Sequence, residues 1–403
     1  MKLKSLFMAG AMSLAATGAW AECAYENEVP LKSLSAGFEA WKAVTDAMAE
    51  CGNFSASLDQ EFREKQPEAF AANPSLYQIG GVANETMIPL LNAGSLRPLD
   101  DLVEKYGQDL LPNQLIKVDG KVMAIAMMVN AQHLMYRDDV LADLGIEEPK
   151  TYDDVLAAAA KIKEAGVMEY PIGGTFKTGW NLAQEFVNMY MGEGGEFFGE
   201  GNMPAINNEQ GVKALETMKA MTEYMDPEFL VSDSTYVQQQ FQQGKIAMAN
   251  LWASRAAAMN DEAESQVVGK VTMASAPMGA AAPATTIWWD GVVLAANMSD
   301  EEADAAFRLV LEGIDGEMVS ANNDTAVWLS PAYTPGDLAA GAAASAENGA
   351  KAYPASAPMG VLHSALGNGL ADYLTGAKDA STTLADIEAS YLTAAKEAGL
   401  VNN

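Results

Sequence analysis

The stretch QQGKIAMANLW, residues 242–252, reads as a short strand that ends in a tryptophan. A second stretch, TIWWDGVVLAA at residues 286–296, places Trp288, Trp289 and Asp290 directly before another strand. Tryptophans where a strand meets a loop, beside a carboxylate, are typical of a pocket that stacks on a ligand face and hydrogen-bonds its edge. These two strand–loop junctions therefore predict a small-molecule site.

The first 21 residues have the features of a secretory signal peptide. Two lysines precede an apolar run at residues 6–16, and the tripeptide AWA at 19–21 forms a cleavage site. The apolar run is too short for a membrane span. Glu22 precedes Cys23, where a lipoprotein signal needs a small residue. We therefore expect a mature chain that begins at Glu22 and is free in the periplasm.

The chain is strongly acidic, with 24 Lys and Arg against 54 Asp and Glu and a formal net charge of −30. Such a surface repels nucleic acid and anionic lipid, which argues against both as partners. It suits solubility, a saline habitat or a cationic ligand, and solubility is the preferred interpretation. Because 49% of the 403 residues are hydrophobic, the chain can bury large cores, and its length indicates two lobes.

The two cysteines of this exported chain favour a disulfide. Cys23 precedes the first predicted strand, and Cys51 follows the first predicted helix. The helix of a β-α-β unit runs back toward the start of its strand, so the bridge is preferred to two buried thiols. On the chain-entropy model, closing the loop between the two cysteines would raise the free energy of unfolding by about 3 kcal/mol. His133 and His363 have no metal-ligand spacing, and neither a metal nor a cofactor is expected.

Apolar runs alternate with helical patterns, which indicates an α/β architecture. The sequence predicts strands over 29–35, 53–58, 76–79 and 121–129. It predicts helices over 38–50, 61–72 (kinked or restarted at Pro67), 210–224, 301–313 and 384–399, and another between the cap Thr151 and Gly166. The glycine- and alanine-rich stretch 336–350 reads as a loop.

Five motifs occur in a set order, at residues 74–100, 118–140, 144–166, 244–252 and 291–296, and the last two lie within the stretches quoted above. Together they resemble the family 1 extracellular solute-binding proteins, the maltose-binding-protein-like subunits that capture sugars for bacterial ABC importers. The likeness extends over nearly the whole mature chain. The clearest departure is SLSAGF at 33–38, where many sugar-binding members carry a tryptophan pair.

The resemblance implies a two-lobed periplasmic binding protein fold of type II, with a hinge crossed more than once and a ligand cleft between the lobes. Lobe 1 is expected to contain 22–129 and 292–335, and lobe 2 to contain 130–291 and 336–403. The resemblance further implies a monomer without enzymatic activity. It would bind a carbohydrate, either a mono- or disaccharide or a polyol, and deliver it to the transmembrane subunits of an ABC permease.

Two other functions stay open from the sequence. An aromatic cage with Asp290 on an acidic chain would suit a cationic solute such as a polyamine. A secreted glycoside hydrolase is the less favoured alternative, since two catalytic carboxylates could lie among 54 acidic residues. No nucleophile elbow, phosphate-binding glycine loop or histidine-based triad is visible in the sequence.

Trp252 is the leading ligand-binding candidate, because the family places a stacking aromatic there. Strand alternation points Trp288 and Trp289 in opposite directions, so one is expected to face the cleft and the other to pack. The sequence does not decide between them. Asp290 could accept hydrogen bonds from hydroxyl groups or pair with a cation.

The remaining candidates each have a structural alternative. They are Trp180 (site or surface cap), Asn130 (ligand or hinge backbone), Tyr136 (beside the crossing), Phe38 and Glu39 (after the first strand; Phe38 could be core) and Gly80 (close backbone approach or a turn).

Overall fold

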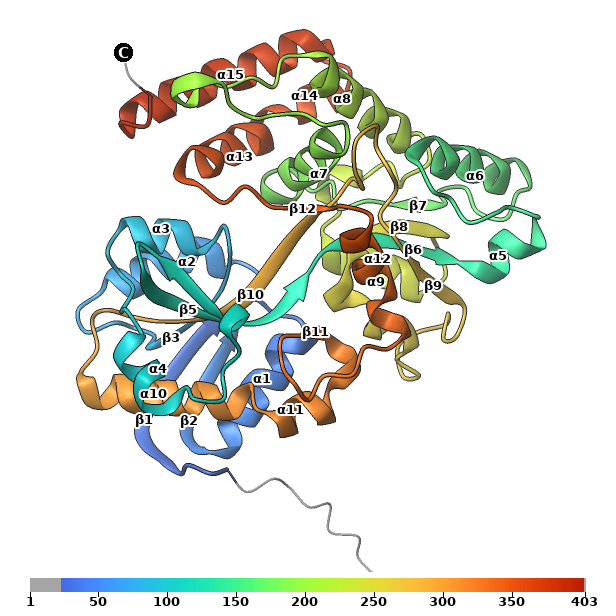
Figure 1. Cartoon of the computed structure of the whole chain (residues 1–403). Helices are drawn as coiled ribbons and strands as arrows, with labels where there is room; N and C mark the ends of the chain where they lie inside the picture. Colours follow the sequence, from blue (N-terminus) through green and yellow to red (C-terminus); the bar gives the residue numbers. More distant parts are fainter. Residues whose placement is uncertain (1–22, 402–403) are drawn as a thin grey trace, which may run out of the picture.

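The computed structural model describes residues 23–401, and the predicted signal peptide lies outside this range. The chain forms two α/β lobes, each built around one sheet (Figure 1). The larger sheet has the strand order β11-β5-β10-β3-β1-β2, with β4 paired to β5 and β12 paired to β10. Its strands are β1 (Asn27–Ser35), β2 (Gly52–Leu58), β3 (Ile79–Ala83), β4 (Leu115–Val118), β5 (Lys121–Asn130), β10 (Thr286–Leu294), β11 (Val327–Trp328) and β12 (Lys351–Ala352).

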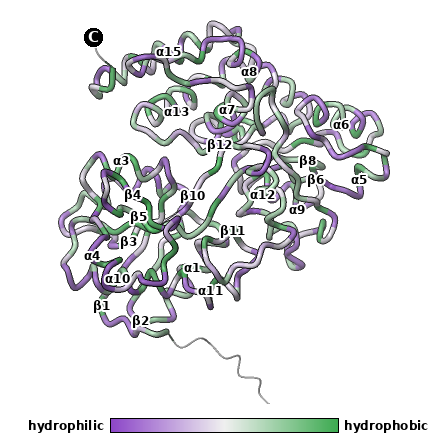
Figure 2. Tube along the Cα trace, in the orientation of Figure 1, coloured by the Kyte–Doolittle hydropathy of each residue, from purple (hydrophilic) through white to green (hydrophobic). Residues whose placement is uncertain are grey.

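Helices cover both faces of this sheet, because its central strands are apolar on both sides. Val292 and Leu294 of β10 face one core, while Val293 faces the other. The first core is covered by α1 (Glu39–Glu50), α4 (Asp100–Tyr106), α10 (Asp300–Gly313) and α11 (Gly316–Ala321). The second is covered by α2 (Phe62–Ala71) and α3 (Met87–Asn92). Figure 2 shows hydrophobic stretches along the inner strands and alternating hydropathy along the outer helices.

The second lobe is built on a four-stranded sheet of order β7-β8-β6-β9. Its strands are β6 (Gln132–Arg137), β7 (Ile172–Gly173), β8 (Met248–Trp252) and β9 (Val271–Ala274). Its helices are α5 (Asp138–Asp143), α6 (Tyr152–Glu164), α7 (Trp180–Gly192), α8 (Glu209–Thr222), α9 (Ser234–Gln242), α12 (Ala340–Glu347), α13 (Ala357–Gly369), α14 (Ala371–Leu374) and α15 (Ala380–Glu397).

Two strand crossings connect the lobes. The fully buried Ala131 separates β5 of the larger sheet from β6 of the smaller one. Strand β10 runs between the lobes and then pairs with β3 and β5 (Figure 1). After β11 the chain returns to the second lobe at α12. The residue boundaries given above for the two lobes stay a prediction.

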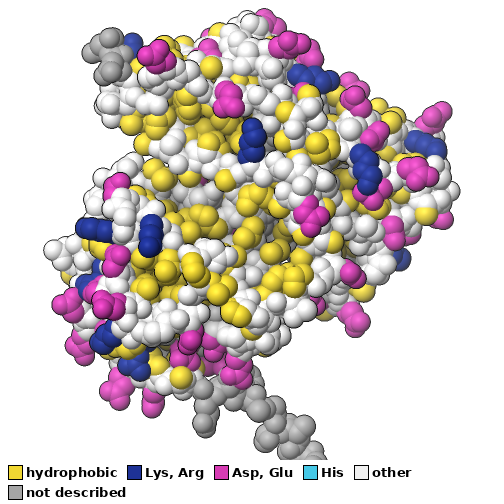
Figure 3. Space-filling view, viewed as in Figure 1, with side chains coloured by type: hydrophobic (Ala, Val, Ile, Leu, Met, Phe, Trp, Pro, Cys, Tyr) yellow, Lys and Arg dark blue, Asp and Glu magenta, His cyan; other side chains and the backbone are white. Residues whose placement is uncertain are grey.

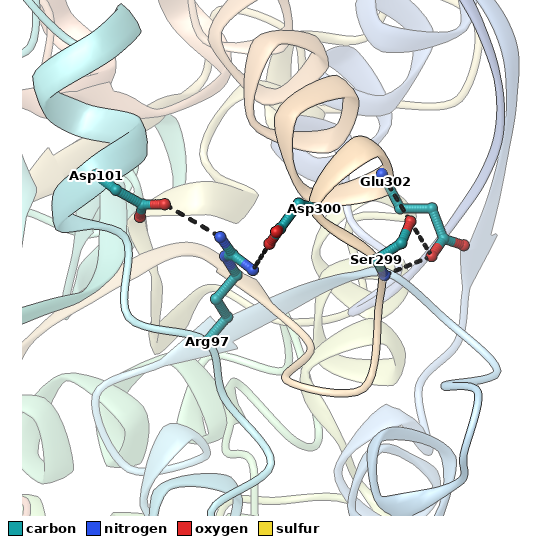
Figure 4. Close-up of polar contacts among 5 residues, drawn as sticks. All are labelled: Arg97, Asp101, Ser299, Asp300 and Glu302. Atoms are coloured by element: carbon teal, nitrogen blue, oxygen red, sulfur yellow. Dashed lines mark hydrogen bonds and ion pairs between the residues drawn. The ribbon is translucent and has the colours of Figure 1, made fainter.

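Polar contacts fix the ends of several elements. Thr151 caps α6 as predicted: its side chain accepts from the Asp154 N–H, and the Asp154 carboxylate accepts from the Thr151 N–H. Ser299 and Glu302 form the same reciprocal pair at α10 (Figure 4). Beside it, Arg97 joins the two helices α4 and α10 by bonds to Asp101 (3.0 Å) and Asp300 (2.9 Å). These exposed ion pairs contribute little stability individually.

Cys23 and Cys51 form a disulfide that ties the start of the described chain to the end of α1, with Cα atoms 5.4 Å apart. In residues 23–401, no helix combines the length and the apolar character that crossing a bilayer requires. The same residues contain one group of potential metal ligands: the two bridged cysteines and Glu312. Because both sulfurs are in the disulfide, this group offers no thiolate ligand.

Most predicted elements are confirmed, and three segments are wrong. The strand expected directly after Trp288, Trp289 and Asp290 begins before them, so all three lie within β10. The strand predicted over 76–79 lies instead at Ile79–Ala83, so the glycines 80 and 81 lie within it. The predicted loop 336–350 contains helix α12. Alanine is the strongest helix former, and Gly341 lets this helix pack directly on His133, which outweighs the glycine content.

Candidate functional site

Three tryptophans predicted from the sequence form one aromatic cluster in the second lobe. Trp180 begins α7, Trp252 ends β8 and Trp288 lies within β10. The ring centroids of Trp180 and Trp288 lie 5.6 Å apart, those of Trp252 and Trp288 lie 5.9 Å apart, and those of Trp180 and Trp252 lie 6.4 Å apart. Trp288 is buried at 3% exposure, while the other two are partly exposed. Trp288 is therefore the base of the cluster, and Trp180 and Trp252 offer its accessible faces.

A glycine turn places Trp180. Gly179 has φ +98°, a region open mainly to glycine, and its N–H donates to the Gly367 carbonyl of α13 at 3.1 Å. A Cβ on Gly367 would lie 2.6 Å from the Gly179 oxygen. The two glycines thus hold the start of α7 against α13.

Tyr353 and His363 support the cluster from behind. The Tyr353 ring lies 4.3 Å from that of Trp288, and the His363 ring lies 5.2 Å from that of Trp180. His363 Nε2 lies 3.0 Å from the Trp180 carbonyl oxygen, which can only accept, so Nε2 carries the hydrogen. Nδ1 then accepts from the Tyr353 hydroxyl at 2.9 Å. Burial lowers the pKa of His363 to about 4, which keeps the ring neutral.

Charged side chains of the first lobe face this cluster. The guanidinium carbon of Arg63, on α2, lies 4.3 Å from the Trp180 ring centroid, a cation–π contact. The indole N–H of Trp180 donates to the Glu85 carboxylate, which follows β3, at 3.3 Å. Trp180 therefore contacts both a cation and an anion of the opposite lobe.

Burial shifts the pKa values of these charges. It lowers the pKa of Arg63 and raises that of Glu85, and their attraction opposes both shifts. It also raises the pKa of Asp290 to about 7, against the pull of Arg63 and a hydrogen bond from Asn130. Arg63 Nε has no hydrogen-bond partner in residues 23–401. The site thus combines a free buried donor, Arg63 Nε, with a buried acceptor, Asp290, and a partly buried one, Glu85.

A second contact between the lobes lies beside Trp252. The guanidinium carbon of Arg255 lies 5.9 Å from the ring centroid of Phe38, and its Nη1 donates to Gln238 at 2.9 Å. Burial lowers the pKa of Arg255 to about 10, while the negative charges of Asp233 and the exposed Glu39 oppose this. Phe38 and Glu39 therefore lie at the junction of the lobes, next to the segment that follows Trp252.

Figure 3 shows the surface hollowed between the two lobes, with hydrophobic side chains gathered on both sides of the hollow. Aromatic faces on one lobe and hydrogen-bonding charges on the other are the composition of a small-molecule site.

Other predicted residues do not join the aromatic cluster, although Asn130 reaches the site through its bond to Asp290. Trp289 packs on the opposite side of β10, against the core formed by α2 and α3. Tyr136 is buried in the second-lobe core, within a strand whose neighbours are β8 and β9. Asn130 exchanges hydrogen bonds with Ser254, from Nδ2 to Oγ at 3.2 Å and from the Ser254 N–H to Oδ1 at 3.3 Å. Its amide therefore satisfies hinge groups.

Gly80 has a packing role. It lies within β3 rather than at a turn, and a Cβ there would meet Phe70 Cζ at 2.6 Å and Val293 at 3.1 Å. We expect Gly80→Ala to lower the free energy of unfolding by about 1–3 kcal/mol, because the fully buried Phe70 cannot move away freely. Urea unfolding measures this. Unchanged stability together with lost solute binding would instead place the Gly80 backbone in the site.

The sequence interpretation missed Arg63, Glu85, Tyr353 and His363. Arg63 lies in the helical run FREK at 62–65, which reads as a solvated surface. Tyr353 and His363 reach the cluster from a segment far along the chain, and no spacing in the sequence marks them. Their one available signal was residue type, since a lone histidine in an apolar helix needs a buried partner.

Comparison with known proteins identifies the family. Residues 60–312, more than half of the chain, match the family model described as bacterial extracellular solute-binding protein. The chain belongs to this family. The predicted resemblance is therefore confirmed.

Solved binding proteins share the whole two-lobed fold. An ABC transporter solute-binding protein from Agrobacterium radiobacter K84, in complex with ribitol, superposes with a TM-score of 0.81 at 21% identity. The match covers 92% of this chain and 100% of that one. One from Agrobacterium vitis S4 with bound D-mannitol gives 0.78 at 20% identity, covering 92% and 99%. Maltose-bound T. maritima MalE3 gives 0.78 at 17% identity, covering 90% and 99%. The predicted two-lobed α/β fold is confirmed.

A curated relative matches over a shorter stretch. The "Probable sugar-binding periplasmic protein" of Mesorhizobium japonicum is 28% identical over 154 residues. The match spans 36% of this binding protein and 36% of that relative, about a third of each.

Proposed function

We propose that this binding protein captures a neutral, polyhydroxylated solute between its lobes and delivers it to an ABC permease. The solute would be a mono- or disaccharide or a polyol. The observation that carries the proposal is the contact of Trp180 with Arg63 and Glu85 across the lobes. It joins an aromatic face to a donor and an acceptor at one point.

The chemistry of a carbohydrate matches this arrangement. Its C–H faces stack on indole rings, and its hydroxyl groups both donate and accept. Arg63 can donate to hydroxyl oxygens, while Glu85 and Asp290 can accept from hydroxyl hydrogens. A single solute that touches both sets would hold the lobes together, which couples binding to closure.

The charges favour a neutral solute over a polyamine. Arg63 already covers a face of Trp180, so a cationic solute would compete with it and be repelled by it. Arg255 adds a second, partly buried positive charge at the junction of the lobes. The acidic net charge of the whole chain is therefore better explained by solubility than by the ligand.

The similar proteins support the same solute class. Two of the similar structures hold ribitol and D-mannitol, and a third holds maltose. We extend this class to the present chain, together with a monomeric state, a periplasmic location and a permease partner.

A thermal-shift screen of the mature chain 22–403 tests the proposal. The panel contains ribitol, D-mannitol, maltose, gluconate and putrescine, since any ligand that binds only the native state raises the melting temperature. We expect one neutral member to raise it by at least about 3 °C at saturation. Stabilisation by putrescine or gluconate alone would overturn the proposed solute class. Chromatography should recover the stabilising solute intact, and its cleavage would indicate a hydrolase.

A further inference from the structure

A chain of buried hydrogen bonds leads from the binding cluster into the second lobe. The Trp288 indole N–H donates to Thr286 Oγ1 at 2.8 Å, and the Thr286 hydroxyl donates to Asn188 Oδ1 at 3.0 Å. Asn188 Nδ2 donates to Gln132 Oε1, and Gln132 Nε2 donates to Glu185 Oε1 at 2.9 Å. All five side chains are at most 3% exposed. Four consecutive bonds thus connect the base of the cluster to one carboxylate.

The bonds all run in one direction. Each group in the chain donates toward Glu185, which accepts a further bond from the Thr175 hydroxyl. An ionised carboxylate can only accept, so Gln132 must turn its NH₂ toward Glu185 and its oxygen toward Asn188. Asn188 must then present its own oxygen to Thr286, which leaves a lone pair of the threonine for the Trp288 N–H. The carboxylate therefore sets the orientation of every later member.

This arrangement is sensitive to single losses, because buried polar networks are strong only when every member is satisfied. Gln184 reinforces it by donating to both Asn188 (2.8 Å) and Thr286 (2.9 Å). Without an acceptor at residue 185, nothing holds the Gln132 amide in a single orientation. The orientations of Asn188, Thr286 and the Trp288 indole are then no longer fixed either.

We propose that Glu185 is a positioning residue of the binding site, which acts through Gln132, Asn188 and Thr286 to fix the indole of Trp288. Trp288 in turn supports Trp180 and Trp252, the accessible faces of the cluster. The consequence for affinity rests on the proposed function, whereas the hydrogen-bond coupling does not.

Protonation of Glu185 gives the coupling a measurable signature. Burial raises the pKa of Glu185 to about 7, with the bonds from Thr175 and Gln132 opposing the shift. Above pH 7 the ionised carboxylate therefore fixes the direction of the hydrogen bonds that lead to Trp288. Below pH 7 the protonated group gains a donor of its own and no longer dictates the direction.

Few groups around Glu185 share that pH range. Tyr152 of α6 titrates far above it, and His363 of α13 and His133 of β6 have their pKa values lowered to about 4 by burial. The charged residues of α8 are exposed, or, for Lys219, bonded to the Leu374 carbonyl. Two groups near the cluster need their own controls: Asp290 on β10, with a pKa raised to about 7, and Glu85, whose pKa burial also raises.

The test follows the indole N–H signals of the solute-free mature chain, labelled with ¹⁵N-tryptophan, by NMR from pH 5 to 9. Trp288→Phe assigns the Trp288 signal. We expect this signal to shift with a midpoint near pH 7 in the wild type, in Asp290→Asn and in Glu85→Gln. Glu185→Gln should abolish the shift, because the isosteric amide does not titrate.

Thr286→Val is the second variant, since it keeps the shape of residue 286 and removes only the link. Its Trp288 signal should not titrate, although Glu185 is intact. A wild-type signal that does not titrate, or titration that persists in Glu185→Gln or Thr286→Val, would overturn the proposal. With a solute identified by the screen, Thr286→Val should bind it about tenfold more weakly. If Thr286→Val abolished the titration but bound the solute normally, the proposed solute site would be wrong and the hydrogen-bond coupling would stand.

Discussion

Trp180→Ala is expected to weaken solute binding about 100-fold, the largest loss from any single substitution in the cleft. The substitution removes a stacking face, the hydrogen bond to Glu85 and the surface beneath Arg63. Isothermal titration calorimetry with the solute found by the screen measures the loss.

The matched control is Trp289→Phe. Trp289 is also partly buried, but it packs against the core beneath α2 and α3 and lies outside the cluster. Its substitution should lower stability slightly and leave the affinity within about twofold of the wild type. An equal loss of affinity in both variants would contradict the role assigned to the aromatic cluster, because Trp289 lies outside it.

Cys23→Ser combined with Cys51→Ser is expected to lower the free energy of unfolding by about 3–4 kcal/mol. The bridge joins residues 28 positions apart, and on the chain-entropy model the stabilisation depends on the length of that loop. Denaturant unfolding of the oxidised wild type and the double variant measures the difference.

Solute affinity provides the internal control for this variant. Cys51 lies in the core of the first lobe beneath α1 and α10, and neither cysteine contacts the aromatic cluster. The double variant should therefore bind solute normally at temperatures where it is folded. Stability equal to that of the wild type would show that the bridge contributes nothing beyond the packing of its two sulfurs.

Local chemistry made much of the fold predictable. The cap formed by Thr151 and Asp154, the strand-like run at 121–129 and the turn at Gly166 depend on nearest neighbours, and each is confirmed. The strand at Ile79–Ala83 was misplaced because its glycines read as a turn. Gly80 is required by its contact with Phe70 and Gly81 by its contacts with Ser35 and Trp41, which only the tertiary structure creates.

The site was predictable on one side only. The tryptophans are conspicuous in the sequence, and Trp180, Trp252 and Trp288 come together as an aromatic cluster. Arg63 and Glu85 were not predictable, because each lies among other polar residues in the sequence. Only the folded structure brings them into contact with Trp180 of the opposite lobe. The choice between Trp288 and Trp289 likewise needed the register of β10, which turns Trp288 toward the second lobe.

A crystal structure of the mature chain grown with the most stabilising neutral solute would locate the binding site. We expect the solute to lie against Trp180 and Trp252, with its hydroxyl groups bonded to Arg63 and to Glu85 or Asp290. A solute bound elsewhere on the chain would contradict it, as would a charged ligand that displaces Arg63 from the Trp180 ring.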